Sequence, residues 1–383
     1  MRMLFSLLVL FVLSACSTEE NFEIPKEVAV LENVHIIPPR SEPLSRINIE
    51  KLVVLGDIDD HVFGRITGIT VDEDRRIYLA DDDNKTIHVF DEQGKRITSI
   101  GRDGRGPGEF GQIMHLRNDN RHLYASDLSQ MRIHIFSIPG WQHVKTINLF
   151  DERPDIAELR RTQPGNYFLR NDGTFLVAFA ENINPMAIND PLFQFYYMVN
   201  TDGKIISDRI VRQKTVEFIG GIGSGLFPSP FSTRTLVAVS TNGSVYTAES
   251  DRFFIKIHNE EGNYEKAIYY PYSNAALNLE KLLQNYSDPG RRQMIRNTDV
   301  PNTWPALDRL MADDRGRIWA AAITDHPDVH EWWVLSPKGD FLSRFTWPRE
   351  KAIQKIKGDY LYTLETNAET GEEFIVKYEI SFF

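Results

Sequence analysis

The chain has 383 residues and carries 43 Lys and Arg against 54 Asp and Glu, which gives a formal net charge of −11 at neutral pH. No basic run is longer than a pair, and nucleic-acid binding depends on clustered Lys and Arg, so we expect no nucleic-acid partner. Cys16 is the only cysteine. The fold therefore depends on burial of an apolar core, for which the chain is long enough.

The N-terminus has the features of a bacterial export signal. Arg2 supplies a short positive region, Leu4–Leu13 is an apolar stretch too short to span a bilayer, and Leu13-Ser14-Ala15-Cys16 resembles a lipobox. The alternative is an ordinary signal peptide that happens to contain a cysteine. We expect residues 1–15 to be a lipoprotein signal peptide and Cys16 to carry the lipid. The membrane is then a partner through this lipid, and we expect the protein in the cell envelope, anchored at the outer membrane and facing the periplasm or the surface.

Residues 16–45 form the next segment. They contain several Glu and Pro residues and show no sustained apolar periodicity. This composition is typical of an extended tether. We expect it to hold the folded domain, residues 46–383, away from the membrane.

A short phrase recurs along the folded domain. Its copies are Ile77-Tyr78-Leu79-Ala80-Asp81, Leu123-Tyr124-Ala125-Ser126-Asp127, Val245-Tyr246-Thr247-Ala248-Glu249, Ile318-Trp319-Ala320-Ala321, Leu361-Tyr362-Thr363-Leu364 and, in degenerate form, Phe175-Leu176-Val177-Ala178. Self-similarity at intervals of roughly 40–50 residues indicates a repeat array, most often a β-propeller. The aromatic residue at the second position of this phrase is called the phrase aromatic below. In three copies it precedes a turn glycine by 16 residues: 78 to 94, 124 to 140 and 246 to 262.

Each phrase has a turn cluster before it, an apolar segment of period two after it, and then a second turn and a further strand-like segment. Four strands joined by three turns make one propeller blade. The last blade has only three strands before Phe383, so we expect Ile47–Leu55 to pair beside Phe374–Ile380 and close the ring. The predicted fold is all-β, a six-bladed β-propeller with a small helical insertion before blade five.

The residues of the first blade and its connector carry a family resemblance. Ile77-Tyr78-Leu79-Ala80-Asp81, Ile87-His88-Val89-Phe90 and the connector Gly101–Phe110 are similar to NHL repeats and to TolB-like propellers, which include many bacterial lipoproteins. The resemblance is best over about residues 65–150. It implies a six-bladed propeller and implies little about activity, because one scaffold carries many functions.

The insertion at about 273–305 is the largest departure from the repeat. We expect a helix over Ala275–Leu283, ended by Asp288-Pro289-Gly290. The insertion could cap the channel, with arginines for an anionic ligand and a tryptophan as a stacking platform, or it could be a packed helical excursion. Its ligand-binding candidates are Arg291, Arg292 and Trp304.

Another departure is the lengthened loop His326–Glu331. His326 and His330, with carboxylates beside them, invite a metal or ligand site, although Pro327 disfavours the helical spacing of many zinc sites. The alternative is an exposed hairpin tip. Just after this loop, Trp332 and Trp333 face opposite sides of a strand, so we expect only one of them in the core.

Two further motifs have structural explanations. The glycine-rich Gly101–Phe110 lacks the Lys-Ser/Thr ending of a phosphate loop and is followed by a strand, so we expect an inter-blade connector, as for Gly220–Gly225. Asp81-Asp82-Asp83-Asn84 could bind calcium, but Asp and Asn after a strand commonly cap a turn. We expect the capping role.

No convergent catalytic set is visible, and catalytic residues remain unknown at this point. We therefore expect a ligand-binding or protein-scaffolding module that is not an enzyme, with an unknown protein or carbohydrate ligand. The alternative is an envelope enzyme (a lyase, lactonase or glycan hydrolase). The resemblance allows a channel-bound calcium or zinc, since several six-bladed propeller families hold a metal there. No other cofactor is predicted.

Overall fold

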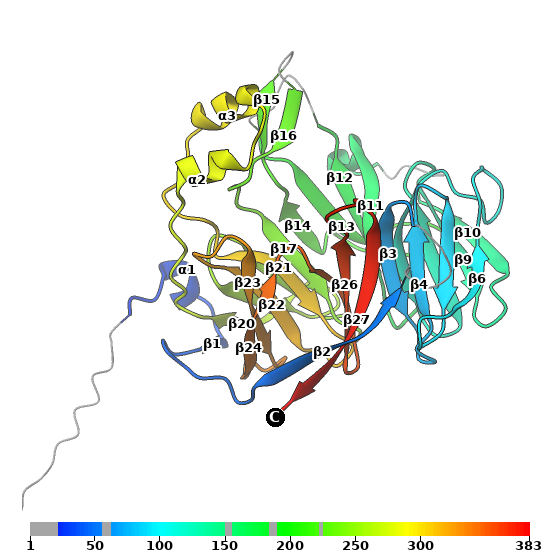
Figure 1. The fold of residues 1–383 in the computed structure, drawn as a ribbon, viewed down its shortest axis with the longest axis horizontal. Helices are drawn as coiled ribbons and strands as arrows, with labels where there is room; N and C mark the ends of the chain where they lie inside the picture. The colour runs from blue at the N-terminus through cyan, green and yellow to red at the C-terminus, as the bar shows by residue number, and fades with distance from the viewer. Residues whose placement is uncertain (1–21, 56–62, 150–154, 184–189, 222–224) are drawn as a thin grey trace, which may run out of the picture.

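A computed structural model of the chain describes residues 22–55, 63–149, 155–183, 190–221 and 225–383. Six sheets are arranged around a central axis (Figure 1), which confirms the predicted six-bladed propeller. The strands joined by hairpin turns are antiparallel, as in blade one. Cys16 and the signal segment lie outside the described residues.

The first three blades follow in chain order. Blade one consists of β3 (Ile66–Val71), β4 (Ile77–Asp81), β5 (Thr86–Phe90) and β6 (Arg96–Ile100). Blade two consists of β7 (Ile113–Asn118), β8 (His122–Asp127), β9 (Arg132–Ser137) and β10 (His143–Asn148). A 3-10 turn, η1 (Ala157–Leu159), precedes blade three, which consists of β11 (Thr162–Leu169), β12 (Phe175–Glu181), β13 (Phe193–Val199) and β14 (Val211–Lys214).

The last three blades complete the ring. Blade four consists of β17 (Thr235–Val239), β18 (Val245–Glu249), β19 (Phe254–His258) and β20 (Tyr264–Tyr269). Blade five consists of β21 (Leu307–Ala312), β22 (Ile318–Ile323), β23 (Val329–Leu335) and β24 (Phe341–Pro348). Blade six consists of β25 (Ala352–Lys357), β26 (Tyr360–Thr366), β27 (Glu373–Phe382) and β2 (Ile47–Leu55).

Ring closure follows the expected pairing. β2 lies antiparallel to β27, with Ile49 opposite Ile380 and Leu55 opposite Ile375. The strand from the start of the domain therefore supplies the outer strand of blade six, and the prediction is confirmed. Figure 1 shows β2 and β27 side by side, coloured blue and red from opposite ends of the chain.

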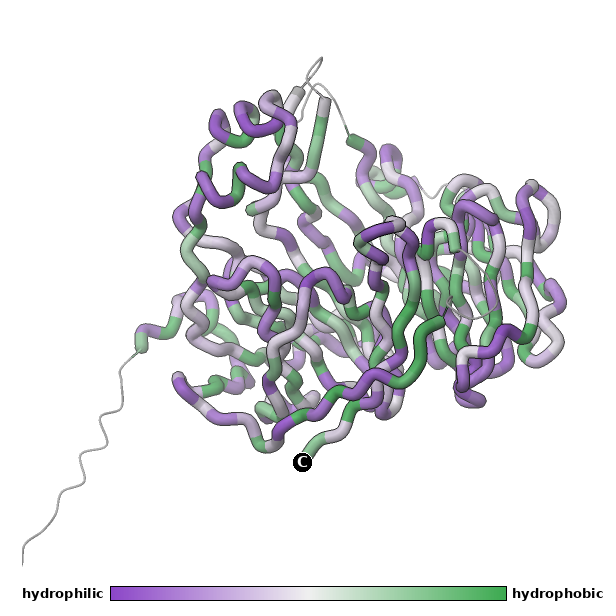
Figure 2. Tube along the Cα trace, in the orientation of Figure 1, coloured by the Kyte–Doolittle hydropathy of each residue, from purple (hydrophilic) through white to green (hydrophobic). Residues whose placement is uncertain are grey.

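The core consists of apolar clusters between neighbouring blades. Tyr78 packs between blades one and two, whereas its neighbours Ile77 and Leu79 pack between blades six and one. Figure 2 shows hydrophobic stretches along the strands of every blade. The expectation that only one of Trp332 and Trp333 is in the core is wrong: their exposed fractions are 2% and 1%, because both faces of a blade are covered by adjacent blades.

Part of the expected tether is packed against the propeller. After α1 (Lys26–Ala29), β1 (Val34–Ile36) pairs in parallel with β20 and adds a fifth strand to blade four. Val28 is buried against this edge. For residues 26–37 the extended tether is therefore a wrong expectation, because backbone pairing and apolar contacts hold this stretch on blade four.

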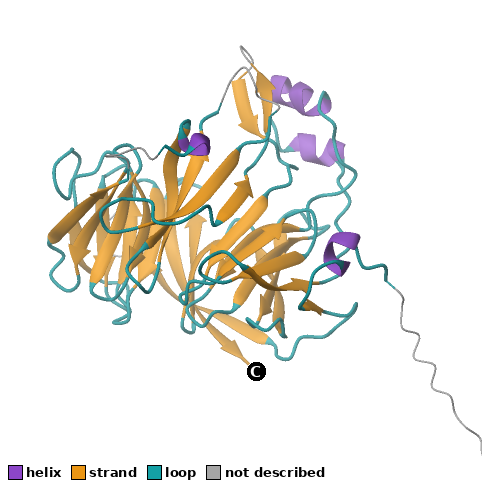
Figure 3. Cartoon of the chain, turned by 180° about the vertical axis from the view of Figure 1, so that it is seen from behind, coloured by secondary structure: helices purple, strands orange, loops and turns teal. Residues whose placement is uncertain are grey.

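The insertion before blade five forms two helices, α2 (Leu279–Gln284) and α3 (Pro289–Arg296). They pack on the hairpin of β15 (Phe218–Gly221) and β16 (Gly225–Pro228), at the edge of the molecule (Figures 1 and 3). α3 was not expected. Asp288 accepts a hydrogen bond from the Gly290 amide and Pro289 is the first helical residue, so the predicted helix breaker also starts a helix.

The two glycine-rich segments differ. Gly101–Phe110 joins β6 to β7 and is a connector, as expected, closed by Glu109, which accepts hydrogen bonds from the Gly106 amide and from Arg102. Gly220, Gly221 and Gly225 also lie between two blades but belong to the β15–β16 hairpin. Residues 222–224 lie outside the described residues.

Candidate functional site

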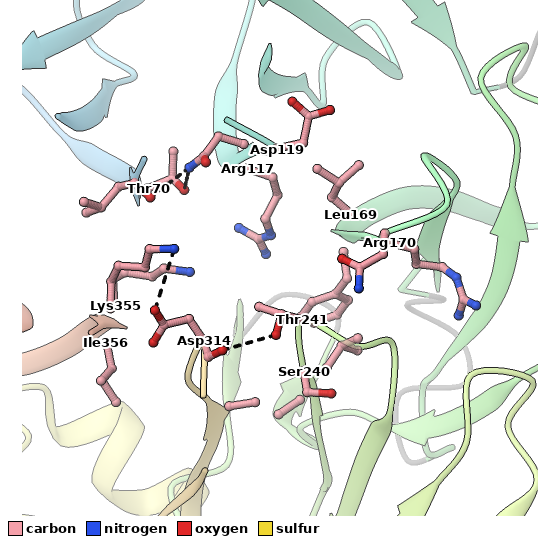
Figure 4. Close-up of a pocket in the computed structure, with 18 of the residues that line it drawn as sticks. Thr70, Arg117, Asp119, Leu169, Arg170, Ser240, Thr241, Asp314, Lys355 and Ile356 are labelled. Carbon is pink, nitrogen blue, oxygen red and sulfur yellow. Dashed lines mark hydrogen bonds and ion pairs between the residues drawn. The ribbon is translucent and has the colours of Figure 1, made fainter. Parts of the chain in front are cut away.

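The ends of the six innermost strands surround a cavity of about 760 Å³ at one mouth of the central channel. This mouth, here called the turn mouth, is where the first strand of each blade turns into the second. One lining residue from each blade, in blade order, is Thr70, Arg117, Asn166, Thr241, Asp314 and Lys355. In Figure 4 Arg117 and Lys355 extend into the cavity from different strands.

Arg117 and Lys355 occupy the same position of the repeat. In every blade one residue of the first strand pairs with the phrase aromatic or its equivalent, as Arg117 pairs with Tyr124 and Lys355 with Tyr362. The corresponding residues of the other blades are Thr70, Phe168, Ala238 and Met311. Only blades two and six place a charge at this position, and these two blades flank blade one.

The guanidinium of Arg117 is held in place by neighbours that carry no charge. Its Nη1 donates to the Leu116 carbonyl at 2.8 Å and its Nη2 to Asn166 Oδ1 at 3.0 Å. The group also lies over the rings of Tyr167 and Phe168, 5.5 and 5.4 Å from their centroids. Burial lowers the pKa of Arg117, yet an arginine remains charged in proteins.

The ammonium of Lys355 has no hydrogen bond or ion pair with any residue that the structure describes. Burial and, after it, the positive charge of Arg117 lower the pKa of Lys355 to about 8. Lys357, two residues further on, is different: its Nζ lies 2.5 Å from Glu73 Oε1 and 3.7 Å from Asp314 Oδ2. Among the described residues, Lys355 therefore contributes an unpaired positive charge to the cavity, whereas the charge of Lys357 is paired with carboxylates.

The carboxylates at the rim are already engaged. Asp314 accepts from the Gly358 amide at 2.9 Å in addition to its contact with Lys357. Burial alone would raise the pKa of Asp119, but hydrogen bonds from Tyr124 and from backbone amides outweigh it and hold that pKa below its ordinary value. None of these carboxylates pairs with Arg117 or Lys355, so the cavity keeps two like charges.

The candidates from the insertion lie elsewhere. Arg292 Nε donates to the Tyr286 carbonyl, Arg291 lies 5.7 Å from the Phe227 ring centroid, and Trp304 packs in the apolar cluster of α2 and α3. None of the three lines the turn-mouth cavity. Their ligand-binding role stays a prediction.

The two candidate histidines have different surroundings. The side chain of His326 is 67% exposed, with Nδ1 4.0 Å from Asp328 Oδ2. That of His330 is 10% exposed, with Nε2 3.5 Å from Asp308 Oδ2. Across the described ranges, no group of three or more His, Cys, Asp or Glu is placed to hold a metal ion. The channel-bound calcium or zinc remains a prediction, which elemental analysis of the dialysed protein tests.

Asp81 to Asn84 have the expected capping role. Asp81 accepts from the Gly64 and Asn84 amides at 3.1 and 3.2 Å, and Asp82 accepts from the Ile113 amide of blade two at 2.8 Å. The hydrogen bonds of Asp81, including those from His88 and Asn84, outweigh its burial and lower its pKa to about 2. Asp82 therefore stabilises the junction between blades one and two, whereas Asp81 caps the turn within blade one.

Neither Arg117 nor Lys355 was singled out from the sequence. The available signal was the repeat itself: aligning the first strands on the phrase aromatic shows a charge in two copies out of six. A search for motifs of fixed spacing cannot find this pair, because the two residues lie 238 positions apart.

Comparison with known proteins gives the same fold. A family model described as a 6-bladed beta-propeller, DUF5128, matches residues 48–211. No curated protein matches the chain. Within the part of the chain that the structure describes, no helix has the length and apolar character needed to cross a membrane.

Solved structures resemble the chain at low sequence identity. A DUF4221-family member from Bacteroides vulgatus is 12% identical with a TM-score of 0.54, covering 88% of this chain and 99% of its own. A candidate exported protein from Bacteroides fragilis is 11% identical with a TM-score of 0.51, covering 91% and 99%. Regucalcin from Agrobacterium tumefaciens, a calcium-binding protein, is 11% identical with a TM-score of 0.44, covering 91% and 97%. The first two likenesses show the propeller fold, and any activity has to be argued from the chain's own site.

Proposed function

We propose that this protein is a lipid-anchored binding module of the cell envelope whose turn-mouth cavity binds an anionic ligand. One observation carries the binding proposal: Arg117 and Lys355 place two positive charges at a repeat position that is uncharged in the other four blades. Like charges in a partly buried site repel each other and lose hydration. An anion between them would offset both costs. No described carboxylate is paired with either group, although the charges of Asp314 and Asp313 act on Lys355 from a distance.

The binding proposal is tested with sulfate, phosphate and glucuronate as probes, by isothermal titration at constant ionic strength. We expect at least one probe to bind the wild type, and Lys355→Met or Arg117→Met to lower its affinity by about tenfold or more, the usual effect of losing a charge-assisted hydrogen bond. Methionine is the residue that blade five has at this position, Met311. Lys281→Gln removes an exposed positive charge that does not line the cavity; it is the control and should bind like the wild type.

The same titration has a defined pH dependence. Because the pKa of Lys355 is lowered to about 8, its ammonium is charged below that pH and loses its charge above it. Sulfate affinity of the wild type should therefore fall between pH 7 and pH 9, while Lys355→Arg should keep it. Binding that is equal in wild type and both methionine variants, or absent for every probe, would contradict the proposal.

The anchor is tested separately. Leu13-Ser14-Ala15-Cys16 supports lipidation at Cys16, and two or more acyl chains give stable membrane attachment. Metabolic labelling with a fatty-acid probe should mark the wild type and leave Cys16→Ala unlabelled. Equal labelling of both would refute the lipid anchor and leave the binding proposal untouched.

A further inference from the structure

A second, smaller cavity of about 210 Å³ lies between blades five and six. Its wall is formed by the first residues of β21, β23 and β25 and by the last residues of β24. The turn-mouth cavity uses the other ends of β21 and β25. The two cavities therefore lie at opposite ends of the same strands, and we call the smaller one the interblade cleft.

Two guanidinium groups line the interblade cleft. Arg309 Nη1 donates to the Ile353 carbonyl at 2.8 Å, and Arg349 Nε donates to the Val329 carbonyl at 3.3 Å. Neither arginine forms a salt bridge with a carboxylate among the described residues. The backbone carbonyls fix each side chain and leave other N–H groups of each fork available.

The acidic residue of the cleft is already paired. Asp308 Oδ1 lies 2.9 Å from Arg234 Nη2, and Asp308 Oδ2 lies 3.5 Å from His330 Nε2. Burial lowers the pKa of His330 to about 4, although the charge of Asp308 acts in the opposite direction. His330 is therefore neutral at pH 7 and adds no charge to the cleft. The positive groups in the lining are Arg309, Arg349 and Lys351, and of these Lys351 has a carboxylate partner, with its Nζ 3.9 Å from Glu365 Oε2.

The remaining wall is rigid and aromatic. Trp347 Nε1 donates to the Lys351 carbonyl at 2.7 Å, and its ring packs against Tyr378 with centroids 5.1 Å apart. Trp332 also lines the cleft and is buried. A site with a few polar groups fixed against apolar walls has the build of a small-molecule site.

We propose that the interblade cleft binds a small carboxylate through Arg309 and Arg349. The planar guanidinium fork matches the two oxygens of a carboxylate, and the volume restricts the ligand to a compact molecule. This inference is independent of the proposed function, because it concerns other residues at the opposite end of the strands. It also gives His330, a candidate from the sequence, a place in the wall of an anion site.

The test is a titration of succinate in the Arg117→Met/Lys355→Met double variant, in which the channel site is disabled. We expect one succinate site, with affinity about tenfold or more lower in Arg349→Gln and in Arg309→Gln. The control is Lys338→Gln, which removes an exposed charge on the same blade and should leave the affinity unchanged. Circular dichroism and the thermal midpoint identify a variant that fails to fold. If Arg349→Gln fails to fold, Arg349→Lys replaces it, because a lysine keeps the positive charge but lacks the planar guanidinium fork.

Two results would overturn the inference: no succinate binding in the double variant, or binding that neither arginine substitution weakens. Inorganic phosphate is titrated in parallel. If phosphate binds as tightly as succinate, the assignment to carboxylates is wrong. Absence of channel binding in the wild type, together with succinate binding in the double variant, would refute the proposed function alone, so the two proposals fail separately.

Discussion

The buried carboxylates at the ends of the innermost strands explain why the repeat phrase contains an aromatic residue. Asp72 accepts from Arg76 Nε at 2.7 Å and from the Tyr78 hydroxyl at 2.8 Å. In blade five Asp313 accepts in the same way from Arg317 Nε and, at 2.9 Å, from Trp319 Nε1. The phrase aromatic thus buries its ring between blades and directs its polar atom to the turn. This requirement favours Tyr or Trp over Phe.

Tyr78→Phe tests this role because it removes only the hydroxyl. Asp72 and Tyr78 are both buried, so one acceptor site of the carboxylate is left without a donor. We expect the free energy of unfolding, measured with urea, to fall by about 1–2 kcal/mol. Tyr264→Phe is the control: its hydroxyl donates to the Glu32 carbonyl in an exposed position, so its loss should be smaller. An equal loss in both variants would show that the Asp72 contact contributes nothing specific.

At the scale of the element, the sequence predicted the strands because their apolar residues alternate and their turns contain Asn, Asp and Gly. The prediction was wrong where the alternation of residues along a strand was taken to mean one buried face and one exposed face. Trp332 and Trp333 lie on opposite faces of β23, and each face packs against a different neighbouring blade. In a propeller, period two separates two interfaces and does not separate core from solvent.

Other elements could not be predicted because their partners are remote in sequence. β1 has three residues, and its partner β20 lies more than 220 positions away; a segment this short has no period of its own. The same limit applies to the candidate site. The repeat predicted which strands line the channel. It could not predict that Arg117 and Lys355 lie near each other across blade one, because this depends on the strand register in the folded ring.

For the whole molecule, closure is the feature on which the other contacts depend. Each apolar cluster between blades needs two neighbouring blades. The clusters on either side of blade six include residues of β2: Leu55 packs between blades six and one, and Ile47 and Ile49 pack between blades five and six. Without β2, blade six would have three strands and β27 would have an unpaired edge. Both interfaces of the last blade would lose apolar contacts at once.

Two truncated chains test this dependence, one beginning at residue 46 and the other at residue 56. The first loses α1 and β1 but keeps β2, so it should retain a cooperative transition. The second also loses the pairing of β2 with β27, and we expect its thermal midpoint to lie at least about 10 °C below that of the first. Since an open strand edge can pair with another chain, the second should also associate as its concentration rises, which light scattering would detect. Equal midpoints and a monomeric second chain would mean that blade six is stable with three strands and that the ring does not depend on its first strand.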